Sequence, residues 1–181
     1  MDRAKQVCNA ARGDDPTCKE CGKLEDIVHV FCSCHKITQL WHMIFKWWQR
    51  RTKEEISVTP KETLLGLRPT NANLQYKELH LPFTYLRTQT LTTIKKERSR
   101  VRQGCPARSA HQLFQATLRN MQQSANSLYM HACKWDKWHP PKGEVIHPRS
   151  VQAFREAWID SGLAKITPAK SLLVILRAPG H

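Results

Sequence analysis

Acidic residues are scarce in this sequence. Its 181 residues contain 15 Asp and Glu against 29 Lys and Arg, which gives a formal net charge of +14. Long hydrophobic runs are also missing, since the apolar run at 171–176 is far too short to cross a bilayer. There is no internal repeat or low-complexity tract, so the chain is not a repeat array. With 40% hydrophobic residues, it can still build a modest core, in one domain or two small ones.

The beginning of the chain (MDRAK) does not have the composition of a secretory signal peptide. The seven cysteines are an odd number, which favours metal ligation in a reducing compartment over a framework of disulfides. We therefore expect a nuclear or cytoplasmic protein that is neither secreted nor bound to a membrane.

Catalytic constellations are missing as well. Asp14-Asp15 invites comparison with the metal-binding aspartates of polymerases, but such a pair needs flanking apolar strands. Here Ala11-Arg12 lies upstream and Pro16 follows, so we interpret the pair as part of a loop. Outside the cysteine-rich segment, no His, Cys or carboxylate pairing has catalytic spacing. We therefore expect that the chain is not an enzyme.

The cysteine-rich segment between residues 18 and 34 has the ligand spacing C-x2-C-x7-H-x4-C. Two cysteines separated by two residues, with a glycine after the second, form a turn that points both sulfurs at one position. A His/Cys pair then follows at a spacing found in structural zinc sites. Three thiolates and one imidazole close a tetrahedron and leave no open position for a substrate. The pattern predicts a structural Zn²⁺ ion bound by Cys18, Cys21, His29 and Cys34.

Two alternatives stay open for this segment. Cysteine is also common in cores as a small hydrophobic residue, although a C-x2-C pair with further ligands favours a metal. The identity of the fourth ligand depends on how the loop closes. Cys32 would give H-x2-C, which is shorter than the usual spacing, so Cys34 is preferred. His35 or Cys8 replaces Cys34 if the loop closes differently.

Apolar residues at helical spacing predict a mostly α fold. We expect a small zinc knuckle, a bundle of about four helices and an irregular C-terminal tail. Leu64-Leu65-Gly66-Leu67 is interpreted as a short apolar anchor, and the run at 171–176 as one strand or two helical turns. The expected helices lie at about 35–51, 82–103, 109–134 and 148–162. The expected segments are a tether (1–17), the knuckle (18–34), a basic helical region (35–103) and a helical extension (104–181).

Positive charge begins where the knuckle ends. Residues 1–34 have a net charge of −1, residues 35–108 of +10, and residues 109–181 of +5. This asymmetry favours a polyanionic partner, with nucleic acid ahead of a membrane surface. Five basic residues near the end of the second helix exceed what the helix dipole needs. We predict that they contact phosphates: Lys95, Lys96, Arg98, Arg100 and Arg102.

Two tryptophans near the end of the third helix alternate with lysines. Trp135 and Trp138 could stack bases while Lys134 and Lys137 neutralise phosphates. The same tryptophans could instead close the end of the bundle, and the sequence does not decide between the two. Trp47 lies off the main apolar stripe of the first helix, so it is a further candidate for base stacking.

The ligand pattern, followed by Leu40-Trp41 and an aromatic helix, resembles the zinc-binding segment at the C-terminal end of non-LTR (LINE-type) retrotransposon reverse transcriptases. Leu64-Leu65-Gly66 and the basic run at 94–98 are similar to that family, and the resemblance covers residues 16–103. It implies a role in holding element RNA or target DNA while a full-length enzyme copies RNA. The family's ligands carry over onto Cys18, Cys21, His29 and Cys34. The family's polymerase palm and endonuclease are missing here.

We therefore expect a zinc-stabilised nucleic-acid-binding module whose partners are RNA, target DNA and the remainder of a reverse transcriptase. Single-stranded or structured RNA suits a knuckle with aromatics better than the major groove of a duplex. The alternatives are a protein–protein adaptor and a decayed element fragment without a selected function.

Overall fold

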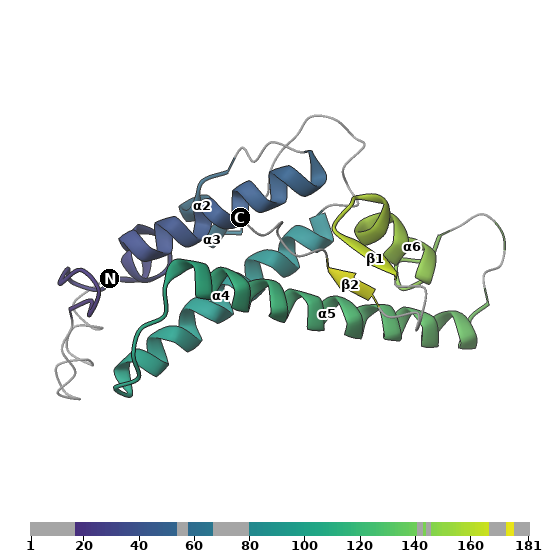
Figure 1. Cartoon of the computed structure of the whole chain (residues 1–181). Helices are drawn as coiled ribbons and strands as arrows, with labels where there is room; N and C mark the ends of the chain where they lie inside the picture. Colours follow the sequence, from purple (N-terminus) through teal and green to yellow (C-terminus); the bar gives the residue numbers. More distant parts are fainter. Residues whose placement is uncertain are drawn as a thin grey trace.

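The computed structural model describes residues 17–53, 58–66, 80–140, 143, 146–166 and 173–175. The expected tether (1–17), Asp14-Asp15 and Cys8 lie almost entirely outside these residues. The elements are η1 (His29–Ser33), α2 (His35–Thr52), α3 (Pro60–Leu64), α4 (His80–Arg102), α5 (Ala110–Trp138), α6 (Val151–Arg155), η3 (Glu156–Asp160), β1 (Ala164–Ile166) and β2 (Leu173–Ile175). The predicted class is confirmed: a small knuckle leads into a helical bundle (Figure 1).

The bundle is built on a hairpin of two long helices, α4 and α5, that run in opposite directions (Figure 1). Ser109 starts α5 with the predicted capping box: its side chain accepts from the Gln112 N–H, and the Gln112 side chain accepts from the Ser109 N–H. Polar side chains also join the two helices, because Gln89 Nε2 donates to Ser124 Oγ at 3.0 Å. Helix α5 corresponds to the helix expected at 109–134, and it extends beyond the predicted end to Trp138.

Helix α2 packs on α5 through its apolar stripe. Trp41 and Trp48 on this stripe are almost completely buried, as the sequence predicts. Trp47 is also buried, with 4% of its surface exposed, so its interpretation as a base-stacking residue is wrong. One continuous cluster of buried side chains extends from the knuckle through α2, α4 and α5 to η3 and β1.

A short helix, α3, was not predicted. Thr59 and Glu62 form a capping box around Pro60, which is the first helical residue. This T-x-x-E signal is visible in the sequence. Leu65, just beyond the helix, is 73% exposed, so at this residue the interpretation of an apolar anchor is wrong.

The C-terminal elements pack against α5. Ser150 caps α6, three residues into the expected fourth helix, by accepting from the Ala153 N–H at 3.1 Å. β1 and β2 then pair antiparallel in the register Ala164↔Ile175 and Ile166↔Leu173. Of the two alternatives for the run at 171–176, the strand is the one found. No described helix combines the length and apolarity needed to cross a membrane.

Candidate metal centre

The first two ligands lie in a tight turn. The Cys18 N–H donates to Lys23 O at 2.8 Å, and the Gly22 N–H donates back to Cys18 O at 2.8 Å. These bonds fold the chain so that Cys21 returns toward Cys18. Gly22 has φ +69°, a backbone conformation that residues with a Cβ rarely adopt. The glycine after the second cysteine is therefore needed for the shape of the turn.

The other two ligands flank the π-helical turn η1. The Cys34 N–H donates to His29 O at 3.0 Å, which closes the five-residue step between them. Asp26 Oδ1 accepts from the His29 N–H at 2.6 Å and fixes the start of this turn. Trp41 of α2 donates from Nε1 to Phe31 O at 2.8 Å and ties the turn to the bundle. The H-x4-C spacing thus corresponds to one π-helical turn held in place from both sides.

The four side chains meet at one position. Their ligand atoms all lie within 4.8 Å of one another. Cys18 Sγ is 3.8 Å from Cys34 Sγ, and Cys21 Sγ is 3.4 Å from His29 Nε2. A tetrahedron with Zn–S distances near 2.3 Å has S···S edges of about 3.8 Å and S···N edges of about 3.6 Å. The donor set and these two distances fit a tetrahedral metal ion.

The four candidate ligands differ in exposure, and the pKa values of two of the cysteines shift in opposite directions. Cys18, His29 and Cys34 are buried, whereas Cys21 is exposed. Burial, together with the neighbouring Cys18, raises the pKa of Cys34 to about 11. A backbone hydrogen bond from Lys23 lowers the pKa of Cys21. Without a cation these effects favour the protonated Cys34 thiol, and a bound cation would supply the stabilisation that a thiolate ligand needs.

The alternative ligands point elsewhere. Cys32 is buried, but it does not belong to the cluster of four. Burial raises the pKa of Cys32, with a smaller opposite effect of Lys61, and the turn η1 that contains Cys32 packs against α3. His35 is exposed and hydrogen-bonds to Gln39. Among the described residues, the structure therefore brings together the four predicted ligands and neither Cys32 nor His35.

Ion pairs attach the knuckle to two helices. Glu25 contacts Arg98 of α4, and Arg102 of the same helix lies 3.6 Å from the same carboxylate oxygen. Glu20 contacts Lys36 of α2. Neither glutamate was predicted from the sequence to contact the helices. The available signal was charge complementarity, since the nearly neutral knuckle precedes a run of cations.

Arg98 also reaches the metal-binding cluster directly. Its guanidinium interacts electrostatically with the Cys18 side chain, and both residues line one cavity, so Arg98 lies next to a candidate metal ligand. Burial lowers the pKa of Arg98, as does the neighbouring Arg102, while Cys18 acts in the opposite direction. Groups that hydrogen-bond the ligands orient them and adjust their electrostatics. Arg98 can do this for Cys18.

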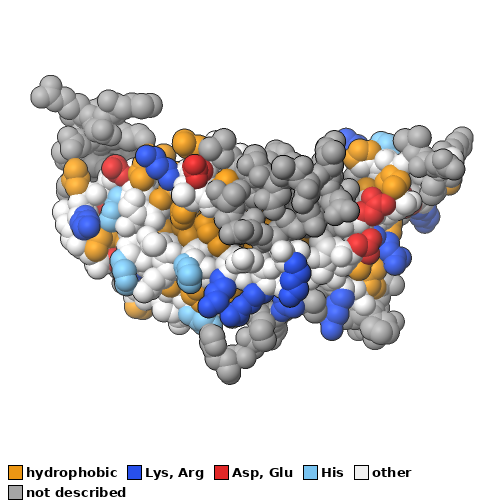
Figure 2. Space-filling view, turned by 90° about the horizontal axis from the view of Figure 1, so that it is seen from above, with side chains coloured by type: hydrophobic (Ala, Val, Ile, Leu, Met, Phe, Trp, Pro, Cys, Tyr) orange, Lys and Arg blue, Asp and Glu red, His pale blue; other side chains and the backbone are white. Residues whose placement is uncertain are grey.

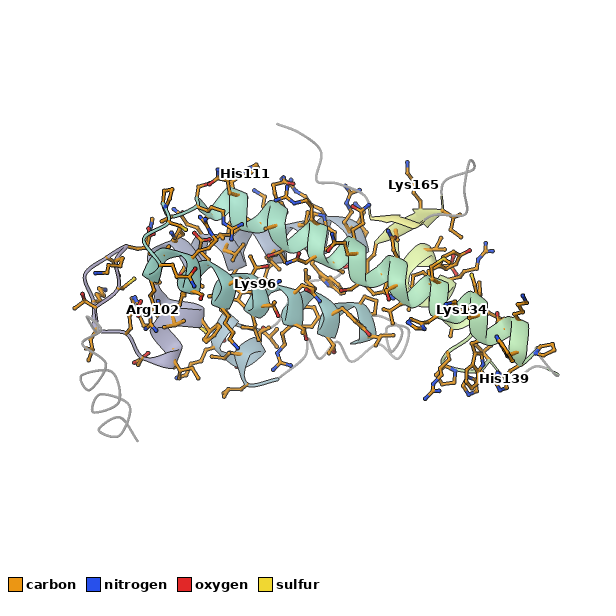
Figure 3. All side chains as sticks on the ribbon, turned by 90° about the horizontal axis from the view of Figure 1, so that it is seen from below. Lys96, Arg102, His111, Lys134, His139 and Lys165 are labelled. Atoms are coloured by element: carbon orange, nitrogen blue, oxygen red, sulfur yellow. The ribbon has the colours of Figure 1, made fainter. Side chains whose placement is uncertain are left out.

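The five basic residues predicted to contact phosphates therefore divide into two groups. Two arginines hold the knuckle, and Arg100 donates to Glu97 Oε2 at 3.2 Å and to Pro106 O at 2.7 Å. Lys95 and Lys96 are exposed, and neither has an acidic partner within the described part of the chain. Figure 3 shows Lys96 on α4, set back from Arg102 at the end of the helix.

The second predicted group lies at the far end of α5, where Figure 3 labels Lys134. Lys134, Lys137 and Trp138 are exposed, with Trp138 78% accessible. Trp135 is instead stacked with His139 at a centroid distance of 4.0 Å. This group is at the opposite end of the molecule from the knuckle (Figure 1), so the structure does not join the two predicted surfaces into one site.

Comparisons of the chain with protein-family models, curated proteins and solved structures find no match.

Proposed function

We propose that the chain is a zinc-stabilised module that binds nucleic acid, with RNA as the first candidate and target DNA as the second. The zinc ion would hold the knuckle rigid, and the helices would supply the contacts to phosphates. Three thiolates and one imidazole are a donor set typical of structural zinc. The chain has no open ligand position in this set, so we expect no metal-assisted chemistry there.

The imbalance of charge on the three long helices carries this proposal. Helix α2 has four basic residues (Lys or Arg) and no acidic one. Helix α4 has six basic residues and one acidic residue, and α5 has three basic residues and one acidic residue. Both acids are engaged: Glu97 is buried against Arg108, and Asp136 Oδ2 accepts from the Val151 N–H at 3.0 Å. In the view from above, basic side chains (blue) outnumber acidic ones (red) on the visible face (Figure 2). Such a surface attracts phosphates without regard to sequence.

Binding of single-stranded RNA to the zinc-loaded chain at several salt concentrations tests this function. The logarithm of the association constant should fall linearly with the logarithm of salt concentration, with a slope of about −0.7 for each phosphate contacted. Fluorescence anisotropy of a labelled strand measures this. A flat salt response, or no binding at low salt, would overturn the proposal.

We further propose that the chain belongs to, or derives from, the C-terminal end of a LINE-type reverse transcriptase. The spacing of the four ligands supports this, and so does Leu40-Trp41, which is buried directly behind the knuckle. Without palm or endonuclease, the chain should neither synthesise nor cleave DNA. Nucleotide incorporation or cleavage by the purified chain would contradict this expectation, and a polymerase reading frame joined upstream in the transcript would support the origin.

A protein–protein adaptor is the second candidate. Leu24 and Ile27, both on the knuckle, are 53% and 54% exposed. The two residues are three positions apart in the sequence, and a contiguous exposed apolar patch often marks a contact surface. Replacing both by serine should abolish binding to the remainder of a reverse transcriptase if the chain is an adaptor, while RNA binding should remain unchanged.

A further inference from the structure

A groove of about 540 Å³ lies where the last turns of α5 meet the start of α6. This volume is within the range of small-ligand sites. Its wall combines residues from the starts of α4 and α6 with one face of α5. Figure 3 shows Lys134 and His139 at this end of α5. Residues that characterise the lining are Leu81, His131, Lys134, Trp138, Arg149 and Phe154.

The two tryptophans of the groove differ in what already covers them. Trp135 is stacked with His139 at 4.0 Å and with His147 at 4.5 Å, and the Arg149 guanidinium carbon lies 5.1 Å from its ring centroid. These contacts make Trp135 part of the wall. Trp138 is 78% exposed, the largest value among the exposed hydrophobic side chains of the described residues. Trp138 therefore offers a large aromatic surface for a ligand.

The charge of the groove narrows the choice of ligand. Lys134 and Arg149 contribute cations, His131 and His139 contribute imidazoles, and the described lining residues include no Asp or Glu. An aromatic surface beside cations, without acids, is complementary to a ligand that has a flat ring and a negative charge. An apolar peptide would use the aromatic surface but would leave the cations unpaired.

We propose that this groove binds an unpaired nucleotide of a single strand, with the base stacked on Trp138 and the adjoining phosphates at Lys134 and Arg149. Stacking on an exposed aromatic ring beside cations is how proteins hold single strands. A paired base inside a duplex does not offer its face in this way. The proposal rests on the proposed function and deepens it, because it names single-stranded nucleic acid as the preferred class.

The test compares two RNA strands of equal length, one with bases and one with abasic residues, so that only stacking differs. The full zinc-loaded chain should bind the strand with bases roughly 5-fold to 100-fold more tightly. Trp138→Ala should remove most of this preference and leave the affinity for the abasic strand unchanged. Lys134→Gln together with Arg149→Gln should weaken binding of both strands and reduce the salt dependence.

Two variants serve as controls. Met130→Ala truncates a 50% exposed side chain of α5 that does not line the groove, and it should leave the preference intact. Trp138→Phe keeps an aromatic ring and should retain part of the preference. If Trp138→Ala keeps the full preference, the inference is overturned. If the unmodified chain binds both strands equally, the groove inference fails while the proposed function stands; if it binds neither, both fail.

Discussion

Glu25 of the knuckle is ion-paired with Arg98 of α4, and Arg98 also lies beside Cys18, a candidate metal ligand, in the wall of one cavity. One guanidinium thus connects an acid and a candidate zinc ligand of the knuckle with the end of a long helix. The Glu25 side chain is only 7% exposed, so this contact is shielded from solvent. The arginine run of α4 therefore has a structural role in docking the knuckle.

Glu25→Gln should destabilise the fold by about 1–2 kcal/mol, because Arg98 and Arg102 lose the charge that they share. The midpoint of urea unfolding measures this. Glu20→Gln is the matched control, since it removes the contact to Lys36 from a glutamate side chain that is 32% exposed. Exposed pairs contribute little, so this change should stay below about 1 kcal/mol. Equal losses for the two variants would contradict a docking role for Glu25.

Metal content distinguishes the ligands. Cys34→Ser should lose stoichiometric zinc, whereas Cys32→Ser should retain it, because Cys32 lies outside the cluster. A structural zinc site contributes about 10–16 kcal/mol of binding free energy, much of which stabilises the fold. Chelation should therefore increase amide hydrogen exchange in η1 and the first turn of α2. Elemental analysis with hydrogen-exchange mass spectrometry measures both effects. Zinc retained by Cys34→Ser would refute the ligand set.

The sequence was sufficient for features that depend on short spacings. The grouping of the four candidate ligands could be predicted because C-x2-C-G defines a turn locally, and Gly22 adopts the positive φ that this turn needs. Apolar periodicity located α2 and α5 because each buries one continuous stripe. The capping box at Ser109 gave a helix start to within one residue. Each of these signals lies within one short, continuous stretch of the sequence.

Contacts between distant residues could not be predicted in this way. No local pattern shows that Arg98 faces Glu25 while Lys95 and Lys96 face solvent. The different environments of Trp135 and Trp138 likewise depend on His147, which returns from a later segment. The pairing of β1 with β2 also depends on where the chain turns back. For the candidate surfaces, the sequence identified the residue types, and tertiary packing decided which of them remain accessible.

Glu97 should make stability depend on acid pH. Burial raises its pKa, but hydrogen bonds from the Arg108 N–H at 2.7 Å, Arg108 Nε at 2.6 Å and Arg100 Nε at 3.2 Å outweigh burial, so the pKa falls below 4.5. Because the folded-state pKa is lower than that of the unfolded chain, the stabilisation is complete above pH 4.5. It is lost as pH falls through the folded-state pKa.

Glu97→Gln provides the measurement. The variant should be about 1–3 kcal/mol less stable at neutral pH, and the difference from the unmodified chain should shrink as pH falls below 4.5. Urea unfolding of both proteins over a pH series gives this difference, and acid release of metal affects both alike. A difference that does not change with pH would show that the ionised form of Glu97 is not what stabilises the fold.

The two groups of cations on α4 should separate binding from stability. Two double variants are compared, and each removes two charges from the same helix. The first combines Lys95→Gln with Lys96→Gln, and the second combines Arg98→Gln with Arg102→Gln. The lysine pair is exposed, so its loss should weaken RNA binding and reduce the salt slope by roughly 0.7 per lost phosphate contact, without changing stability. The arginine pair neutralises Glu25, so its loss leaves a buried carboxylate unpaired and should destabilise the fold by about 1–3 kcal/mol. Anisotropy titrations and urea unfolding of both double variants decide this. If the arginine variant loses RNA affinity at full stability, the arginines contact phosphate directly rather than docking the knuckle.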